Sequence, residues 1–254
     1  MNGLGSFGLH GKNVVVTGAN TGIGQGIACS VSRAGGNVIG VGRSDMSETA
    51  GLIATEGGRF TELRADLGDA KTAMEVIDKI WRETGPINGL VNNAGIIRRA
   101  DAVDFTLEDW DDVMDVNLRS VFFMSQALAK HIFAEGRSGK IVNIASMLSF
   151  QGGIRVASYT ASKSGLAGIT RLLACEWAAR GINVNAIAPG YIVSNNTEAL
   201  RSDQARNEAI LARIPAGRWG EPRDIGDPAV FLLSSASDYM HGATIPVDGG
   251  WLAR

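Results

Sequence analysis

The fold is decided by one stretch of sequence, Thr17-Gly18-Ala19-Asn20-Thr21-Gly22-Ile23-Gly24. It ends a short run rich in valine, and helical periodicity begins at Gly22. Gly18 permits a sharp exit from a strand, and Gly22 and Gly24 leave room for an anion at the start of a helix. A tight turn without a ligand would also use glycines, but the strand before and the helix after favour a turn that binds a pyrophosphate.

Short runs of β-branched residues alternate along the chain with longer segments whose apolar residues recur every three to four positions. The runs predict strands at residues 13–17, 37–41, 59–64, 87–92, 140–145, 182–187 and 243–247. The longer segments predict helices at residues 22–34, 70–83, 107–135, 157–180 and 223–234. Strands joined by helical crossovers form a parallel sheet covered on both faces, so the sequence predicts a doubly wound α/β fold.

No linker, charge block or low-complexity segment divides the 254 residues, and this length suits one open α/β domain. We therefore expect a single dinucleotide-binding catalytic domain over residues 1–254, with ligands beyond the carboxyl ends of the strands. The stretch from Pro189 to Pro222 is polar and loosely patterned. Its part at residues 191–216 is predicted to be a mobile substrate lid.

The charges of the chain are nearly balanced, with 24 basic and 26 acidic residues and a formal net charge of -2. Nucleic acid and membrane partners are not expected, because there is no global field and no run approaches ~18 apolar residues. We expect a cytoplasmic enzyme. Cys29 and Cys175 have small apolar neighbours and are predicted to be buried. His10, His131 and His241 are expected at the solvated surface, and their scatter predicts no metal site.

Three residues further along form a pattern suited to proton transfer. Ser146 follows the strand at 140–145, Tyr159 lies 13 residues later, and Lys163 follows after four more. A spacing of four places Tyr159 and Lys163 on one helix face, where an ammonium would favour the phenolate of a group whose reference pKa is about 10. Ser146 is predicted to orient the substrate oxygen. A Tyr-x-x-x-Lys pair alone is usually an ordinary helix-surface pair, so the pattern is informative only in combination.

In combination these motifs resemble those of the short-chain dehydrogenase/reductase family. The resemblance runs from about residue 8 to the end and is carried by Thr17-Gly18-x-x-x-Gly22-Ile23-Gly24, Asn92-Asn93-Ala94-Gly95, Ser146, Tyr159-Thr160-Ala161-Ser162-Lys163 and Pro189-Gly190. It implies a Rossmann-type fold and a hydride transfer between a nicotinamide dinucleotide and an alcohol or ketone carbon. It also implies a catalytic tetrad in which an asparagine bends a helix and links the lysine through water to solvent: Asn117, Ser146, Tyr159 and Lys163.

The resemblance also implies which residues contact the cofactor. Asp66 would lie beside the adenine, Asn93 to Gly95 along the nucleoside, and Lys163 on the nicotinamide ribose. By itself, Asn92-Asn93-Ala94-Gly95 would equally suit a plain turn at a strand end. The full predicted set is Gly18, Asn20, Thr21, Gly22, Ile23, Gly24, Arg43, Asp66, Leu67, Asn93, Ala94, Gly95, Tyr159, Lys163, Pro189, Gly190, Ile192 and Ser194.

The residues after the second strand bear on the choice of cofactor. An acid there usually binds a free ribose 2′-hydroxyl, and a basic side chain binds a 2′-phosphate. Gly42 stands where the acid would be, Arg43 follows, and Asp45 lies too far along to replace the acid. This favours NADP(H), whereas the most similar subfamily is mainly NAD-linked, so the sequence leaves NAD(H) or NADP(H) open.

Within the family, three stretches resemble bacterial 2-deoxy-D-gluconate 3-dehydrogenases, also called 2-keto-3-deoxygluconate 5-dehydrogenases. They are Ile96-Ile97-Arg98-Arg99, the run from Ala145 to Arg155, and the ending from Val247 to Arg254. The resemblance implies a keto sugar acid as substrate. Because a carboxylate needs a cation, the predicted substrate residues are Arg99 and Arg98, then Gln151 and Arg155, with Asn195 and Asn196 in the lid. For each arginine, a solvated or interface position is an equal alternative.

Other functions would share these motifs. A gluconate 5-dehydrogenase, or another carbonyl or polyol reductase, would carry the same tetrad, and a non-catalytic dinucleotide-binding sensor would keep the same fold. The family resemblance also implies a homotetramer, built through the long helices at 107–135 and 157–180. Residues 251–254 would then lie at a subunit interface.

Overall fold

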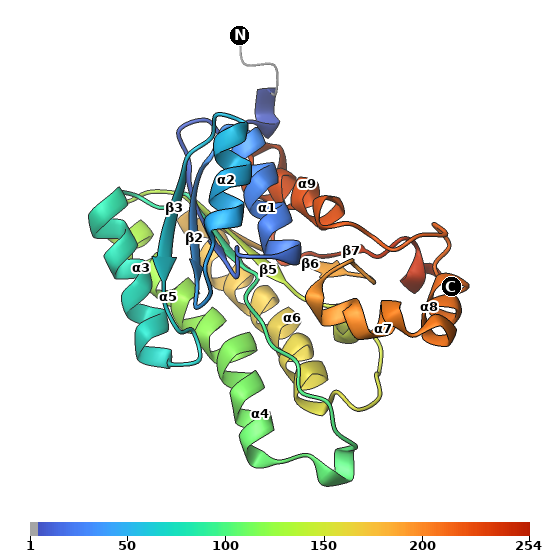
Figure 1. The fold of residues 1–254 in the computed structure, drawn as a ribbon. Coiled ribbons are helices and arrows are strands. Elements are labelled where there is room, and N and C mark those ends of the chain that lie inside the picture. Colours follow the sequence, from blue (N-terminus) through green and yellow to red (C-terminus); the bar gives the residue numbers. More distant parts are fainter. Residues whose placement is uncertain (1–4) are drawn as a thin grey trace.

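The computed structural model describes residues 5–254, and a seven-stranded sheet forms its centre (Figure 1). The strands are β1 (Asn13–Thr17), β2 (Asn37–Gly42), β3 (Phe60–Arg64), β4 (Gly89–Asn92), β5 (Gly139–Ile144), β6 (Ile182–Pro189) and β7 (Thr244–Val247). Every neighbouring pair is parallel, in the order β3-β2-β1-β4-β5-β6-β7. The predicted doubly wound parallel sheet is therefore confirmed.

Helices cover both faces of the sheet (Figure 1). One face carries α1 (Gly22–Arg33), α2 (Ser47–Thr55) and α9 (Pro222–Leu233), and the other carries α3 (Ala70–Thr84), α5 (Ser120–Ala134) and α6 (Ala157–Trp177). Successive side chains of β1 point to opposite faces of the sheet. Val14 and Val16 belong to the core under α1 and α9, whereas Val15 belongs to the core under α3, α5 and α6. Two apolar layers thus hold the central strands from both sides.

The helix predicted at residues 107–135 is interrupted. It consists of α4 (Leu107–Met114), a π-helical turn (Asp115–Arg119) and α5. A π-turn accommodates one extra residue per turn and often marks a functional site, and here it contains the buried Asn117. The apolar pattern continues on both sides of this turn, so its prediction of one continuous helix was wrong, whereas the bend that the family resemblance implied at Asn117 is present.

Three short helices were not predicted from the sequence. One is α2, and the other two, α7 (Glu198–Ser202) and α8 (Gln204–Leu211), lie in the segment predicted as a lid. In α8 only Ile210 is buried, so its sequence shows no apolar stripe. Its N-terminus is instead fixed by Asp203, whose carboxylate accepts a hydrogen bond from the Arg206 N–H at 3.1 Å.

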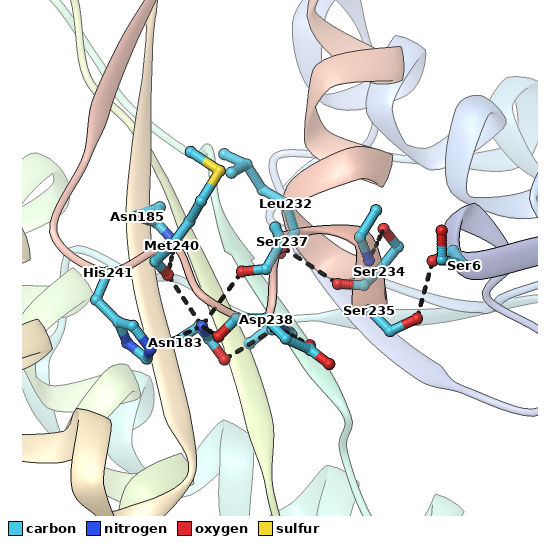
Figure 2. A network of polar contacts seen from close by, with 12 residues as sticks. Ser6, Asn183, Asn185, Leu232, Ser234, Ser235, Ser237, Asp238, Met240 and His241 are labelled. Atoms are coloured by element: carbon cyan, nitrogen blue, oxygen red, sulfur yellow. Dashed lines mark hydrogen bonds and ion pairs between the residues drawn. The ribbon is translucent and has the colours of Figure 1, made fainter.

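Polar side chains of β6 hold the connection from α9 to β7, as Figure 2 shows. The Asn183 Nδ2 donates to the carbonyl oxygens of Asp238 and Met240, both at 2.9 Å, and Asn185 Nδ2 donates to the Met240 oxygen at 2.8 Å. The ammonium of Lys140 donates to the Asn183 Oδ1 at 2.9 Å. Since these buried groups are all paired, β7 is set in register beside β6 and delivers the C-terminal residues to the carboxyl edge of the sheet.

The predictions for the cysteines and histidines were only partly confirmed. Cys29 is buried as predicted, but Cys175 is exposed on the outer side of α6, so that prediction was wrong. His131 stacks on Trp81 and its Nε2 lies 2.6 Å from an Asp78 oxygen, which makes it half-buried rather than simply solvated. Within residues 5–254, no helix is long and apolar enough to cross a membrane, and no three His, Cys, Asp or Glu side chains group as a metal site.

Candidate active site

The glycine turn after β1 forms one wall of a cleft at the carboxyl edge of the sheet. Gly18 and Gly22 have φ values of +65° and +56°, which L side chains rarely adopt. A Cβ on Gly24 would lie 2.0 Å from the Gly18 carbonyl oxygen, so α1 can start this close to β1 only with glycine there. Thr21, the N-cap of α1, makes no side-chain capping bond, which leaves the first N–H groups of the helix free for an anion.

Thr17 ties the ends of β1 and β4 together behind this turn. Its hydroxyl oxygen accepts hydrogen bonds from the N–H groups of Asn93 and Ala94, both at 2.9 Å. The Asn93 side chain donates back to the Thr17 carbonyl oxygen at 2.8 Å. These two strands flank the point where the strand order reverses, which is where ligands bind in such sheets. Thr17 was not predicted as a site residue, although it ends the strand in the quoted motif.

Asn117, in the π-turn, fixes the loop that follows β4. It is fully buried, its Oδ1 accepts from the Ile96 N–H at 2.8 Å, and its Nδ2 donates to the Ile96 carbonyl at 2.9 Å. The same Nδ2 donates to the Ser162 hydroxyl at 3.3 Å, and Ser162 in turn donates to the Tyr159 carbonyl at 2.8 Å. The structure therefore connects Asn117 to α6 through Ser162.

Ser146, Tyr159 and Lys163 converge on the floor of the cleft. Ser146 lies two residues after the end of β5, where its hydroxyl caps a 3-10 turn by accepting from the Leu148 N–H at 3.2 Å. Tyr159 and Lys163 lie one turn apart on α6, with the ammonium 5.6 Å from the centre of the phenol ring. Lys163 is buried and donates to the Ile144 carbonyl oxygen at 2.6 Å.

The cleft has a volume of about 340 Å³ and is continuous at Gly18 and Asn20 with a smaller pocket of about 150 Å³. The structure brings most of the predicted residues to the main cleft: Gly18, Asn20, Thr21, Gly22, Ile23, Gly24, Asn93, Ala94, Gly95, Ser146, Tyr159, Lys163, Pro189, Gly190, Ile192 and Ser194. The smaller pocket holds Arg43, Asp66 and Leu67. Lining residues that were not predicted include Ile144, Ala145 and Thr197 in the cleft and Ser44, Gly68 and Val116 in the pocket.

The predicted substrate residues separate into two groups. Arg98 pairs with Asp109 at 3.2 Å and Asp112 at 2.9 Å, and Arg155 pairs with Asp101 at 3.1 Å. Neither lines the cleft, and their carboxylate partners already balance their charge, so the structure does not place these two arginines for a substrate. Sequence could not show this, because the acids lie outside the motifs.

Arg99 and Gln151 have different surroundings. The Arg99 guanidinium donates to the Asn196 carbonyl oxygen at 3.3 Å, and no carboxylate pairs with it among residues 5–254. Asn196 lines the cleft, so Arg99 lies at its rim. Gln151 does not line the cleft, and its Oε1 accepts a hydrogen bond from the indole N–H of Trp251 at 3.2 Å.

Comparison with known proteins identifies the family. Residues 18–252 match the family model described as enoyl-(acyl carrier protein) reductase. A 2-dehydro-3-deoxy-D-gluconate 5-dehydrogenase of Escherichia coli (strain K12) is 58% identical over 251 residues, which are 99% of each chain. The chain belongs to the short-chain dehydrogenase/reductase family. The resemblance read from the sequence motifs is confirmed, and the chain is an oxidoreductase.

Solved structures agree with this family assignment. A protein of Agrobacterium tumefaciens with bound NADP is 59% identical with a TM-score of 0.94, covering 98% of this chain and 99% of that chain. A gluconate 5-dehydrogenase from Burkholderia cenocepacia J2315, in complex with NADP and tartrate, is 36% identical with a TM-score of 0.92 and covers 99% of both chains. These two structures thus share the fold of this chain over nearly their full length.

The acid and base properties of this short-chain dehydrogenase/reductase follow from burial. Burial raises the pKa of the Tyr159 phenol, while hydrogen bonding with Ser146 and the charge of Arg99 lower that pKa in part. Burial lowers the pKa of Lys163 to about 8. Tyr159 is therefore a neutral phenol near pH 7. Arg99 is the charge that lowers this pKa here, and the effect expected of Lys163 on Tyr159 stays a prediction.

We expect Tyr159→Phe to lower kcat by roughly 10²–10⁴-fold, because it removes the phenol hydroxyl that is predicted to exchange the substrate proton. Cofactor affinity should stay within about threefold, since the ring remains in place. Turnover and dinucleotide titration by fluorescence measure the two effects. Tyr239→Phe is the matched control, because Tyr239 is fully exposed and lines neither part of the cleft. Undiminished turnover in Tyr159→Phe would remove the phenol from the chemistry.

Proposed function

We propose that this chain transfers a hydride between NADP(H) or NAD(H) and a keto or hydroxy sugar acid. The reaction is the interconversion of 2-keto-3-deoxygluconate and its 2,5-diketo form, or the oxidation of 2-deoxygluconate at C3. The similarity to the E. coli dehydrogenase supports the substrate class. The observation that carries the proposal is Arg99, a cation without a carboxylate partner among residues 5–254, at the rim of a cleft that holds the tyrosine, serine and lysine.

The side chains of the cleft divide the chemistry between them. When bound, the nicotinamide supplies or accepts the hydride. Ser146 donates a hydrogen bond to the substrate oxygen, and Tyr159 gives that oxygen a proton in reduction or takes one in oxidation. Lys163 holds the nicotinamide ribose, and Asn117 keeps the loop after β4 and the start of α6 in fixed relation. The glycine turn and the free N–H groups of α1 fit a pyrophosphate.

Arg99 is the group that distinguishes an acid from a neutral ketone. Its guanidinium is a planar donor pair of the kind that binds a carboxylate bidentately. Its charge reaches the active tyrosine, because it is among the groups that lower the pKa of Tyr159. Its neighbour Arg98 has the same charge but is neutralised by Asp109 and Asp112. We therefore place the substrate carboxylate between Arg99 and the lid residues Asn195 and Asn196.

We expect Arg99→Ala to raise KM for sugar acids by roughly 10- to 100-fold, the effect of losing one charge-assisted hydrogen bond. The kcat/KM for a neutral diketone should change by less than about threefold, because an exposed charge acts only weakly on Tyr159 through solvent. Steady-state assays on both substrates check this. Arg98→Ala is the matched control and should leave both substrates unchanged. Equal losses on the acid and the neutral substrate would show that Arg99 is structural.

We further propose that Arg43 lets the enzyme accept NADP(H). Its guanidinium lies at the smaller pocket, 3.7 Å from an Asp66 oxygen, and its side chain is 65% exposed. Gly42, beside it, offers no acid that would repel a 2′-phosphate. An exposed pair at this distance is weak, so a phosphate can replace Asp66 as the partner of Arg43. The NADP in the A. tumefaciens and B. cenocepacia structures supports the proposal.

Arg43→Ala should lower kcat/KM with NADP(H) by roughly 10- to 100-fold, because a charge-assisted contact to the 2′-phosphate is lost. Activity with NAD(H), which lacks that phosphate, is the internal control and should fall by less than about threefold. Measuring both cofactors at one saturating substrate concentration gives the comparison. If activity with the two cofactors falls equally, Arg43 does not bind the 2′-phosphate.

A second candidate substrate is gluconate, oxidised at C5. The B. cenocepacia gluconate 5-dehydrogenase binds tartrate, a hydroxy acid, which supports the same kind of substrate here. Both candidates present a carboxylate to Arg99 and a secondary alcohol to Tyr159. The sugar-acid panel used for Arg99→Ala distinguishes them by kcat/KM. A dinucleotide-binding sensor without chemistry is the alternative if no member of the panel, and no simple diketone, is turned over.

We also propose that the enzyme works as a cytoplasmic homotetramer. A groove of about 270 Å³ lies between α5 and α6, and its lining combines apolar residues, among them Phe122, Phe133 and Leu172, with Gln126, Lys130 and Glu176. Leu172, at 49% exposed, lies with Phe122 and Phe133 in this groove, and a contiguous apolar surface of this kind supports a contact between subunits. Light scattering during size-exclusion chromatography should give four times the mass of one chain. A monomer at micromolar concentration would contradict this assembly.

A further inference from the structure

The last residues of the chain fold back against the lid segment, residues 191–216. Asp248 organises the turn after β7, because its carboxylate accepts hydrogen bonds from the N–H groups of Gly250 at 2.8 Å and Leu252 at 2.9 Å. Gly250 has a φ of +89°, and a Cβ there would lie 3.1 Å from the ring of Pro215. The turn therefore lies directly on the end of the lid segment.

Trp251, which follows this turn, is the centre of a small apolar cluster separate from the two main cores. It is only 5% exposed within its own chain, although the sequence predicted it at a subunit interface. Its ring lies 4.8 Å from that of Tyr191, and the Arg213 guanidinium lies 4.0 Å from its centre. The remaining members include Ile210, Ile214 and Leu200, so α7, α8 and the residues after them all contact this cluster.

The other side of Trp251 faces the segment that follows Ser146. Met147 belongs to the same cluster, and the Trp251 indole N–H donates to Gln151 Oε1 at 3.2 Å. The Gln151 N–H donates to the Met147 carbonyl at 3.1 Å, which closes this segment into a compact turn. One side chain thus joins the lid segment to the turn that begins at the serine of the active site.

The near end of the lid segment lines the cleft. Ser194 and Thr197 bond to each other in a capping box, and Asn195 and Asn196 lie between them. On the outer side, the Asn196 carbonyl accepts the Arg99 bond. The lid segment is therefore held at the cleft by Arg99 and at its back by Trp251. Tyr159 and Lys163 do not depend on either contact, because α6 packs on the main core of the sheet.

We propose that Trp251 is a positioning residue that sets the lid segment against the Ser146 turn and so determines affinity for the sugar acid rather than the chemical step. This inference rests on the proposed function for the identity of the substrate, but not for the contact itself. Losing the indole would leave Ile210 and Ile214 without their common neighbour. The lid residues Asn195 and Asn196 would then occupy a range of positions at the cleft, and substrate binding would have to order them again.

The test compares Trp251→Ala and Trp251→Leu with the same changes at Trp81. Trp81 is a matched control because it is also a buried tryptophan, 9% exposed, and lies on α3, outside the lining of the cleft. Its ring stacks on His131, and its indole N–H donates to Glu135 at 2.9 Å. For the Trp251 variants we expect KM for the sugar acid to rise about tenfold or more, with kcat and the KM for the dinucleotide within about threefold. Trp251→Phe, which keeps a ring in the cluster, should restore most of the affinity.

Amide hydrogen exchange tests the contact independently of any substrate. Protection at residues 195–214 should fall in both Trp251 variants and stay at the wild-type level in both Trp81 variants. If Trp251→Ala does not fold, both the KM for the sugar acid and the amide exchange are measured on Trp251→Leu. Unchanged exchange in the lid segment, or a fall in kcat with KM unchanged, would overturn the inference. If the wild-type protein turned over no sugar acid, the proposed function would fail while the exchange experiment would still decide whether Trp251 holds the lid.

Discussion

Asn117 makes the contact on which the rest of the active site depends. A buried carboxamide must be hydrogen-bonded. The Asn117 side chain accepts a hydrogen bond from the Ile96 N–H at 2.8 Å and donates one to the Ile96 carbonyl oxygen at 2.9 Å. The helix widens into a π-turn where Asn117 turns away from the regular pattern. The loop after β4, which lines the cleft, is consequently held to a helix that also contacts α6 through Ser162. Asn117 thus holds the loop after β4, which forms a wall of the cleft, in a fixed position relative to α6, which forms its floor.

The sequence predicted the parts of the fold that depend on local pattern. Strands buried on both faces must be continuous apolar runs, and the glycine turn must follow the first of them, so both could be read directly. The apolar pattern did not show the π-turn, because apolar residues keep nearly the same spacing across Asn117, and only the family resemblance implied a bend there. Nor did the apolar pattern show the helix α8, since a helix with one buried residue, Ile210, gives no apolar stripe.

The sequence indicated the residues whose type the chemistry requires, but it did not show which arginines are paired with carboxylates. Arg98, Arg99 and Arg155 look alike in sequence, yet two of them are neutralised by acids and only Arg99 has no carboxylate partner in the described part of the chain. A spacing of four correctly placed Tyr159 and Lys163 on one helix face. It could not show that the Lys163 ammonium bonds to a backbone carbonyl of β5, or that the charge of Arg99 contributes to lowering the pKa of the phenol.

The cleft therefore has two halves with different means of support. The half that carries Ser146, Tyr159 and the glycine turn is built on strands and helices of the two main cores, where a change in one side chain disturbs many neighbours. The lid half depends on a cluster of four buried residues, Trp251 and three others. Fewer apolar contacts mean a lower free energy of local opening. In our proposal the residues of the hydride and proton chemistry are therefore held more firmly than the lid segment, which selects the substrate.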